Sequence, residues 1–217
     1  MDFEKARFNM VAQQIRTWDV LDHGILDALS VVKREEFVPP AYRALAFAEV
    51  EIPLGEGASM LPPLVDARLL QAARVKKTDY VLDVGTGSGY SAALLGAMAE
   101  KVVSVEISPV LAEQARANLA RAGVQNVTVE VGDAAHGWPQ RGLYDVIYVG
   151  GALPQLPDDM IEQLKPGGRL IAVVGKRPAM TVMSVTCQTH GVYHTEGLFE
   201  TVVAPLANAA APKAFVF

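Results

Sequence analysis

The apolar positions of the chain change their period near residue 80. Before this point apolar residues recur every three or four positions, which is the spacing of one face of a helix. In the first such segment these positions are Phe8, Val11, Ile15 and Trp18. After residue 80, short apolar and β-branched runs alternate with longer helical segments, the order typical of a parallel sheet. The pattern predicts an α/β fold: N-terminal helices followed by a doubly wound, mostly parallel Rossmann-like sheet.

Four helices are predicted ahead of the sheet. Asp22 stands where it would cap the second, and Pro39-Pro40 ends the run that follows, because proline cannot continue a helix. Residues 49–63 carry two glycines and three prolines, which predicts a loop with a fixed path. The charged segment 33–36 is interpreted as a solvated face of mixed charge. The predicted helices cover Phe3–Trp18, Ile25–Val32, Ala41–Phe47 and Leu64–Ala73.

Five strands are predicted after them, and acidic residues stand at or just beyond several strand ends. Asp83 ends the first strand, Glu106 ends the second, and Asp133 follows the third. Because the carboxyl ends of parallel strands meet at one edge of a sheet, these acids are expected at the same edge. The predicted strands lie over Tyr80–Asp83, Val102–Glu106, Val127–Val131, Tyr144–Val149 and, after a turn, within Lys165–Val174.

A glycine-rich turn connects the first strand to a helix over Ser91–Met98. Gly85, Gly87 and Gly89 alternate with other residues, so the spacing differs from the G-x-G-x-x-G of dinucleotide-binding proteins. Glycine permits the φ values of such a turn and lets a ligand approach the backbone. The arrangement of strand, glycine turn and helix predicts a ligand at the helix N-terminus.

Composition narrows the class of protein. Hydrophobic residues make up 51% of the 217 residues, without an apolar run of the roughly 18 residues that span a membrane. The first residues are charged and show no apolar signal core. A net charge of −5 argues against a nucleic-acid-binding surface. The single cysteine, Cys187, excludes an internal disulfide and is expected in a buried strand. We therefore expect a soluble, cytoplasmic protein that binds neither membranes nor nucleic acid.

No metal site is predicted. His190 and His194 are four residues apart, which would suit a metal on a helix, and no third ligand motif accompanies them. The residues between them, including Val192 and Tyr193, favour a strand instead.

The series of strands, acids and glycines resembles the class I S-adenosylmethionine-dependent methyltransferases over residues 70–176. The resemblance implies that the glycine turn lies against the methionine and ribose parts of S-adenosylmethionine and that Asp83 holds its amino group, directly or through water. Glu106 would accept both ribose hydroxyls, and Asp133 would meet the adenine amino group. The implied cofactor-binding residues are Asp83, Gly85, Thr86, Gly87, Ser88, Gly89, Tyr90, Glu106, Ile107, Gly132, Asp133 and Ala134.

Each of these acids also has a plainer interpretation. Asp133 could cap a helix, and Glu106 could be an exposed acid at a strand end. His136 and Trp138, which follow Asp133, either flank the adenine or pack on the core as loop residues. The joint order of acid, glycine turn and further acids favours cofactor binding over these separate alternatives.

A narrower resemblance rests on the loop before the first strand. Residues 53–63 read Pro-Leu-Gly-Glu-Gly-Ala-Ser-Met-Leu-Pro-Pro. They are similar, without a gap, to the Pro-(Ile/Leu)-Gly-x-Gly-Gln-Thr-Ile-Ser-Gln-Pro of the protein-L-isoaspartate O-methyltransferase family. With segment 33–39 and Val203-Ala204-Pro205-Leu206 near the end, the resemblance extends over residues 9–206. It implies a repair enzyme that methylates a carboxylate of damaged aspartyl residues in proteins or peptides.

The chain departs from this family at the acceptor side of the loop. The catalytic serine of the family falls on Leu61, its threonine on Ser59, and its two glutamines on Ala58 and Pro62. A carboxylate, with a pKa near about 4, is ionised at neutral pH and needs orientation rather than a general base. Leucine offers no hydrogen bond for this purpose, whereas Ser59, two residues away, could face the same side of an extended loop. Ser59 is therefore the candidate catalytic residue.

Three functions remain open at this point. The first is isoaspartyl methylation, the second is methylation of another acceptor in an apolar pocket, and the third is cofactor binding without catalysis, through a partner. Residues 1–63 are expected to belong to the same domain as the cofactor-binding core 64–206, and their helices either cover the sheet or form a wall of the acceptor pocket. The Ala-rich tail 207–217 is a possible edge strand or subunit contact.

Overall fold

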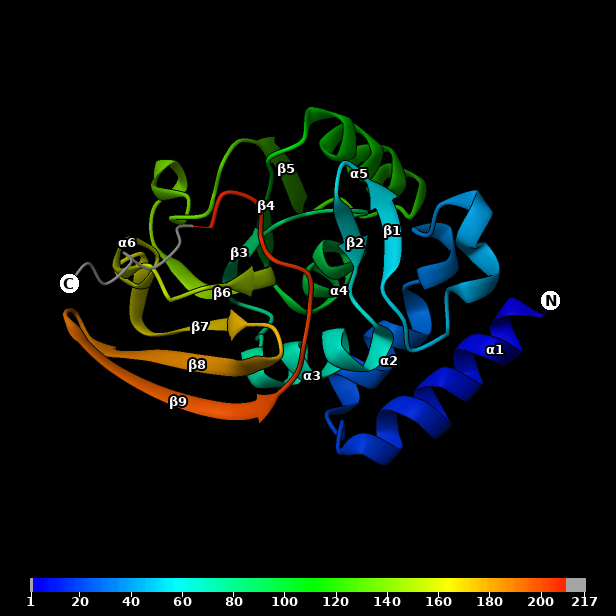
Figure 1. The fold of residues 1–217 in the computed structure, drawn as a ribbon, viewed down its shortest axis with the longest axis horizontal. Coiled ribbons are helices and arrows are strands. Elements are labelled where there is room, and N and C mark those ends of the chain that lie inside the picture. The colour runs from blue at the N-terminus through cyan, green and yellow to red at the C-terminus, as the bar shows by residue number, and fades with distance from the viewer. Residues whose placement is uncertain (1, 210–217) are drawn as a thin grey trace.

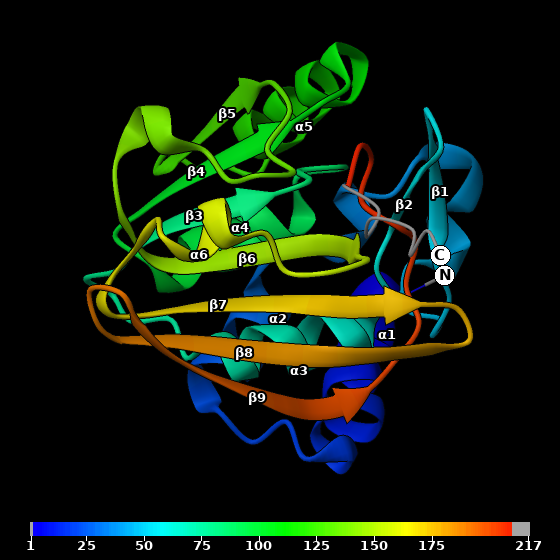
Figure 2. The ribbon, with the colours of Figure 1, turned by 60° about the vertical axis from the view of Figure 1, so that its left-hand side comes forward.

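The computed structural model describes residues 2–209 and is built around one seven-stranded sheet (Figure 1). Its strands are β3 (Tyr80–Val84), β4 (Lys101–Glu106), β5 (Val127–Val131), β6 (Tyr144–Leu153), β7 (Leu164–Lys176), β8 (Ala179–Thr189) and β9 (Val192–Glu200). They lie in the order β5-β4-β3-β6-β7-β8-β9, as Figure 2 shows from top to bottom. The strands from β5 to β7 pair in parallel, whereas β8 and β9 are antiparallel additions.

The sheet is doubly wound around β3. The chain runs from β3 through α4 (Tyr90–Met98), β4 and α5 (Pro109–Arg121) to β5, then returns to β6 and passes through α6 (Asp158–Ile161) to β7. Apolar residues of α4 and α5 share one core cluster with Val81 of β3, whereas Met160 of α6 shares the other with Leu82. Successive strand residues point to opposite faces, so these helices cover opposite sides. The α/β prediction of a doubly wound, mostly parallel sheet with N-terminal helices is confirmed.

The five predicted strands are all present, and the region after them was only partly anticipated. Strand β6 continues four residues beyond the predicted end, to Leu153. Cys187 is fully buried in β8, and Val192 and Tyr193 open β9, as predicted. None of the helices in residues 2–209 combines the length and apolar character needed to cross a membrane.

The helical elements ahead of the sheet are shorter and more varied than the periodicity predicts. They are α1 (Phe3–Asn9), η1 (Met10–Ile15), η2 (Arg16–Trp18), α2 (His23–Val31), η3 (Arg34–Glu36), η4 (Pro40–Leu45) and α3 (Pro63–Ala73). Asp22 caps α2 as predicted, because its side chain accepts the Ile25 N–H at 3.1 Å. The predicted helix over Ala41–Phe47 is instead a 3-10 helix, which begins at Pro40.

The apolar face predicted for the first helix is confirmed at Val11 and Ile15 and wrong at Phe8 and Trp18. The Phe8 and Trp18 side chains are 68% and 62% exposed, while Met10 and Ile15 are fully buried. The segment η1 is a π-helix, which holds more residues per turn than an α-helix. A stripe extrapolated at 3.6 residues per turn therefore drifts off the buried side after η1.

The interpretation of residues 33–36 as a solvated face is also wrong for its two central residues. Arg34 is fully buried and Glu35 is 4% exposed. Glu35 forms an ion pair with Arg7 of α1, and Arg34 donates hydrogen bonds to two backbone carbonyls, of Ala46 and Leu61. A charged residue can be buried when groups elsewhere in the fold pair with it or accept its hydrogen bonds. A local charge pattern does not reveal such partners.

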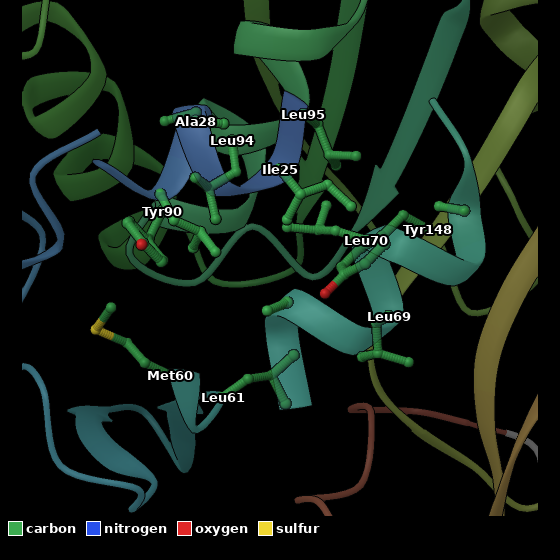
Figure 3. Packing of buried hydrophobic residues seen from close by; sticks show 14 of the residues in the cluster. Ile25, Ala28, Met60, Leu61, Leu69, Leu70, Tyr90, Leu94, Leu95 and Tyr148 are labelled. Carbon is green, nitrogen blue, oxygen red and sulfur yellow. The ribbon is translucent and has the colours of Figure 1, made fainter. Parts of the chain in front are cut away.

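The predicted loop 49–63 contains a small antiparallel hairpin, β1 (Ile52–Gly55) and β2 (Ala58–Met60). Its turn passes through Gly55, Glu56 and Gly57, all with positive φ. Met60 and Leu61 leave the hairpin and pack in the same core cluster as Ile25 of α2 and Leu94 of α4 (Figure 3). The N-terminal segment and the sheet thus share one hydrophobic core, and this core holds the hairpin beside the glycine turn.

Candidate cofactor and acceptor site

A cleft of about 760 Å³, counting the space that opens to solvent, lies at the carboxyl ends of β3, β4, β5 and β6. We call it the large cleft. Its position beside the switch between β3 and β6 is where open α/β sheets bind ligands. Residues from all four strand ends line it, together with the hairpin turn and segment 204–207. The predicted site residues that line it are Ser59, Gly85, Gly87, Glu106, Ile107, Gly132, Asp133 and Ala134.

The three glycines of the turn serve different purposes. All have positive φ, which only glycine adopts without strain. Gly85 and Gly87 line the large cleft, and a Cβ on Gly87 would lie 3.1 Å from the Leu54 side chain of the hairpin. Gly89 does not line it; a Cβ there would press on Ala115 and Leu119 of α5. Gly89 therefore serves helix packing, while the other two leave the backbone open toward the cleft.

The Glu106 side chain is 5% exposed and lines the large cleft. Its Oε2 accepts the Gly87 N–H at 2.8 Å, and its Oε1 accepts the Ser108 N–H at 3.0 Å. A carboxylate oxygen has two lone pairs, so each oxygen can accept one further hydrogen bond. This geometry suits two neighbouring hydroxyls and differs from the exposed strand-end acid considered as the alternative.

Asp133, which follows β5, also lines the large cleft and is exposed. Its Oδ1 accepts the Ala135 N–H at 2.9 Å, and its Oδ2 accepts the Asn208 side-chain amide at 3.1 Å. His136 and Trp138 do not line the cleft. Trp138 packs against the core and donates to Glu130 at 2.6 Å, whereas His136 is exposed. The sequence left open whether His136 and Trp138 flank the adenine or pack on the core, and Trp138 packs on the core.

Asp83 lies beneath the turn rather than in the cleft. It is 1% exposed, and its Oδ2 accepts the Ser104 hydroxyl at 2.6 Å, while its Oδ1 has no hydrogen-bond partner within residues 2–209. The Ser104 hydroxyl also lies 2.6 Å from that of Thr86, which links this acid to the turn. Burial is the main cause that raises the pKa of Asp83 to about 7. A cation beside the free oxygen would favour the ionised form.

A second cavity, about 310 Å³ by the same measure, lies between the hairpin and the glycine turn; we call it the small pocket. Ser59 lines both the large cleft and the small pocket, and Leu61 lines only the latter. The structure thus brings both residues to one space, as an extended loop predicts. The predicted site residues that line the small pocket are Ser59, Leu61, Gly85, Thr86, Gly87, Ser88 and Tyr90.

Several lining residues were missed from the sequence. Segment 204–207 crosses the sheet edge, where the Ala152 N–H donates to the Ala204 carbonyl and the Leu206 N–H donates to the Ala152 carbonyl, both at 2.8 Å. Gly151 allows this close approach, because a Cβ there would lie 3.0 Å from the Leu206 backbone, and Gly150 lies as closely against the glycine turn, 3.1 Å from the Gly85 carbonyl oxygen by the same measure. The paired glycines after a predicted strand were the available signal. Arg34 and Asp66 of the small pocket gave no such signal.

The described residues fit the nucleoside and amino-acid parts of S-adenosylmethionine. A concave site at the topological switch of an open α/β sheet suits a small-molecule cofactor. A buried carboxylate with spare lone pairs lines it, a second acid also lines it, and a glycine turn opens onto it. Within residues 2–209, no group of three or more His, Cys, Asp or Glu side chains could hold a metal ion. Fold and cleft define a class I S-adenosylmethionine-dependent methyltransferase.

Comparison with known proteins gives the family. The family model of protein-L-isoaspartate(D-aspartate) O-methyltransferases matches residues 6–211, and the chain belongs to this family. A protein-L-isoaspartate O-methyltransferase of Methanoculleus marisnigri is 40% identical over 91% of this chain and 87% of its own length. The chain is an S-adenosylmethionine-dependent O-methyltransferase, so the alternative of cofactor binding without catalysis is set aside.

Solved structures agree with this assignment. A structure named protein-L-isoaspartate O-methyltransferase superposes with a TM-score of 0.83 and 25% identity, covering 94% of this chain and 67% of its own. One from Plasmodium falciparum, in complex with S-adenosyl-L-homocysteine, has a TM-score of 0.78 over 95% of this chain and 98% of its own. Its identity is 18%, so it supports the fold alone.

Proposed function

We propose that this protein methylates the side-chain carboxylate of isoaspartyl residues in proteins or peptides, slowly, with Ser59 as the group that orients the acceptor. One observation supports this role above others: Ser59 is the hairpin residue with a hydroxyl that lines both the large cleft and the small pocket. Leu61, at the position of the family's serine, is 7% exposed and packs in the core. In this proposal the acceptor is therefore oriented by the Ser59 hydroxyl, two residues before Leu61.

The residues of this chain would act by placement. S-adenosylmethionine supplies an electrophilic methyl group when bound, and the acceptor carboxylate is already ionised at neutral pH. In the proposed arrangement Glu106 holds the ribose, Asp133 the adenine amino group and Asp83 the amino group of the methionine part. The hairpin then excludes water from the space beside the glycine turn, and Ser59 donates one hydrogen bond to the acceptor.

The test compares the wild type with Ser59→Ala and Leu61→Ser on one isoaspartyl peptide. We expect weak wild-type turnover that Ser59→Ala lowers and Leu61→Ser raises. A hydrogen bond to a charged group contributes about 1.5–3 kcal/mol, which is about tenfold to a hundredfold in rate if it acts in the transition state. Ser30→Ala is the matched control, since Ser30 is an exposed serine of α2 whose hydroxyl bonds only the Leu26 carbonyl.

Stability should be measured alongside, because Leu61 is part of the core. Robust wild-type turnover that Ser59→Ala leaves unchanged would remove Ser59 from its role. Absence of turnover even in Leu61→Ser would overturn the isoaspartyl acceptor.

A different acceptor is the second candidate, and the small pocket favours it. Leu54, Met60 and Leu61 give this pocket an apolar wall. An acceptor with an apolar group beside its nucleophile would place that group against this wall. Incubation with labelled S-adenosylmethionine and ordinary cell extract, beside an isoaspartyl peptide, separates the two candidates.

Two further expectations remain part of the proposal. The first is a cytoplasmic location, supported by the presence of only one cysteine. The second is that residues 1–63 and 64–206 act as one domain, supported by their common core cluster. Of the tail 207–217, Ala207 lines the large cleft and Asn208 bonds Asp133. The rest, from residue 210, lies outside the described residues, and so does the predicted edge strand or subunit contact.

A further inference from the structure

The small pocket contains a buried positive charge, that of Arg34. The Arg34 side chain is fully buried, and none of the carboxylates in residues 2–209 forms an ion pair with it. Its Nε donates to the Ala46 carbonyl at 2.8 Å and its Nη2 to the Leu61 carbonyl at 2.6 Å, so the guanidinium is held in place. The remaining nitrogen, Nη1, is buried and has no hydrogen-bond partner within the same residues.

A second unsatisfied group lies beside it. Tyr90, the first residue of α4, is 2% exposed, and its hydroxyl has no hydrogen-bond partner within the described residues. The Arg34 guanidinium carbon lies 4.8 Å from the centre of the Tyr90 ring, and both residues line the small pocket. Leaving a buried donor unsatisfied costs about 1–3 kcal/mol, and more for a charged group. Two such donors at one cavity indicate that something else completes it.

The missing partner must be an acceptor and should be negative. Arg34 has donors only, and its charge is offset best by an anion that also accepts hydrogen bonds. The other acid of this pocket, Asp66, is already satisfied: it accepts the Tyr148 hydroxyl at 2.5 Å and the Ser91 hydroxyl at 3.0 and 3.1 Å. Burial raises the pKa of Asp66, while the Tyr148 hydroxyl and the Arg34 charge act in the opposite direction.

We propose that the Nη1 of Arg34 and the hydroxyl of Tyr90 form a carboxylate-binding subsite in the small pocket. Tyr90 is among the cofactor-binding residues that the resemblance implies, whereas Arg34 was expected on a solvated face. Two ligands of the enzyme carry a carboxylate: the methionine part of the cofactor and, if the proposed function holds, the acceptor peptide. Both could reach this pocket, because Ser59, Gly85 and Gly87 line it together with the large cleft.

Tyr90→Phe is the primary test, since it removes an atom that has no partner among the described residues and should leave stability unchanged or higher. Binding is measured by calorimetry for S-adenosylhomocysteine, which has the carboxylate, and for 5′-methylthioadenosine, which lacks it. Binding of an isoaspartyl peptide to the S-adenosylhomocysteine complex is the third measurement, with an asparaginyl peptide as its control. Tyr42→Phe is the matched variant, because Tyr42 is 39% exposed on η4 and outside both cavities.

A loss of about tenfold in S-adenosylhomocysteine affinity, without a change for 5′-methylthioadenosine, would assign the subsite to the cofactor carboxylate. Unchanged nucleoside binding with weaker isoaspartyl peptide binding would assign it to the acceptor. No change in any measurement, or an equal loss for both nucleosides, would overturn the proposal.

Failure of the proposed function gives a separate result. If the wild type does not bind the isoaspartyl peptide, that function fails, and the affinity ratio of the two nucleosides alone decides the subsite. Arg34→Lys keeps the charge and loses the fixed fork, so its thermal stability should fall. At temperatures where Arg34→Lys is folded, this variant should weaken binding of the same ligand that Tyr90→Phe weakens. An effect on stability alone would show that Arg34 serves only to hold the backbone of Ala46 and Leu61.

Discussion

The large cleft and the small pocket differ in how their polar groups are satisfied. In the large cleft the acids Glu106 and Asp133 accept hydrogen bonds from the protein itself, mostly from backbone N–H groups. In the small pocket Arg34 and Tyr90 each keep a buried donor without a partner among the described residues. The polar groups of the large cleft are therefore held in position without a ligand. In the small pocket the proposed subsite needs a bound carboxylate to complete its hydrogen bonds. Changes in the large cleft should act on cofactor binding directly, and changes beside the small pocket should depend on the charged groups of the ligand.

The largest effect is expected from Gly87→Val, which would break the large cleft at its backbone. Gly87 has φ +53°, and a Cβ there would lie 3.1 Å from Leu54, on the side where the hairpin meets the turn. Valine would be strained at this φ and would close the approach to the backbone. Calorimetry should find that S-adenosylhomocysteine binding falls by about a hundredfold or more, while circular dichroism shows that most of the fold remains.

Gly123→Val is the control for strain alone. Gly123 has φ +71°, open space surrounds the position that a Cβ would take, and the residue lies outside both cavities. The variant should lose stability and keep cofactor binding. If Gly87→Val binds as the wild type does, the cofactor does not run along this turn.

Glu106→Ala should produce the next largest effect. The side chain would lose its bonds to the ribose hydroxyls and its present bonds to Gly87 and Ser108. Hydrogen bonds to a charged group contribute about 1.5–3 kcal/mol, so affinity for S-adenosylhomocysteine should fall about tenfold to 150-fold. Glu113→Ala, at an exposed acid of the neighbouring α5, is the control and should bind normally. Equal affinity of the wild type for NAD would contradict the assignment of the cofactor.

Asp83→Asn tests the buried acid through pH. Burial raises the pKa of Asp83 in the folded protein to about 7, so the folded state holds this proton more tightly than the unfolded chain does. The stabilisation that protonated Asp83 contributes is fully present below its unfolded-state pKa of 3.8 and is lost as pH rises through about 7. Wild-type thermal stability should thus fall from pH 5 to pH 8 more steeply than that of Asp83→Asn. The raised pKa of Asp66 is common to both proteins, so their difference isolates Asp83.

Asp83→Asn also tests whether Asp83 interacts with the amino group of the cofactor rather than with its nucleoside part. If that group lies near Asp83, wild-type affinity for S-adenosylhomocysteine should rise about tenfold from pH 6 to pH 8, as the acid becomes ionised. The rise should be absent in Asp83→Asn, and absent for 5′-methylthioadenosine in either protein. A pH-independent affinity in the wild type would remove Asp83 from contact with the amino group.

The smallest effect is expected from Asp133→Ala. This acid is exposed, and its hydrogen bonds to Ala135 and Asn208 compete with a ligand for the same oxygens. One solvent-accessible hydrogen bond contributes about 0.5–1.5 kcal/mol, so S-adenosylhomocysteine affinity should fall about twofold to tenfold. Asp158→Ala, at an acid of α6 outside both cavities, is the control. A loss as large as that of Glu106→Ala would mean that the adenine end is held as tightly as the ribose.

The large cleft could be predicted from the sequence because its parts are local. Gly85, Gly87 and Glu106 stand at fixed distances from strand ends, and parallel strands bring their carboxyl ends to one edge whatever the surrounding helices do. The β-branched runs of β3, β4 and β5 were therefore enough to predict where these residues meet. The hairpin was predicted only as a loop with a fixed path, and its glycines Gly55 and Gly57 permit the positive φ of its turn.

Tertiary packing alone decided the small pocket. Arg34 stands in a charged run that resembles a solvated face, and it is buried because the carbonyls of Ala46 and Leu61, far along the chain, meet its guanidinium. The exposure of Phe8 and the burial of Met10 likewise depend on which side of the first helical segment packs against the core. Local periodicity reports strand and helix positions because backbone geometry repeats along the chain. The burial of a charge depends on which distant polar groups the fold brings within hydrogen-bond distance of it, and no pattern along the chain records that.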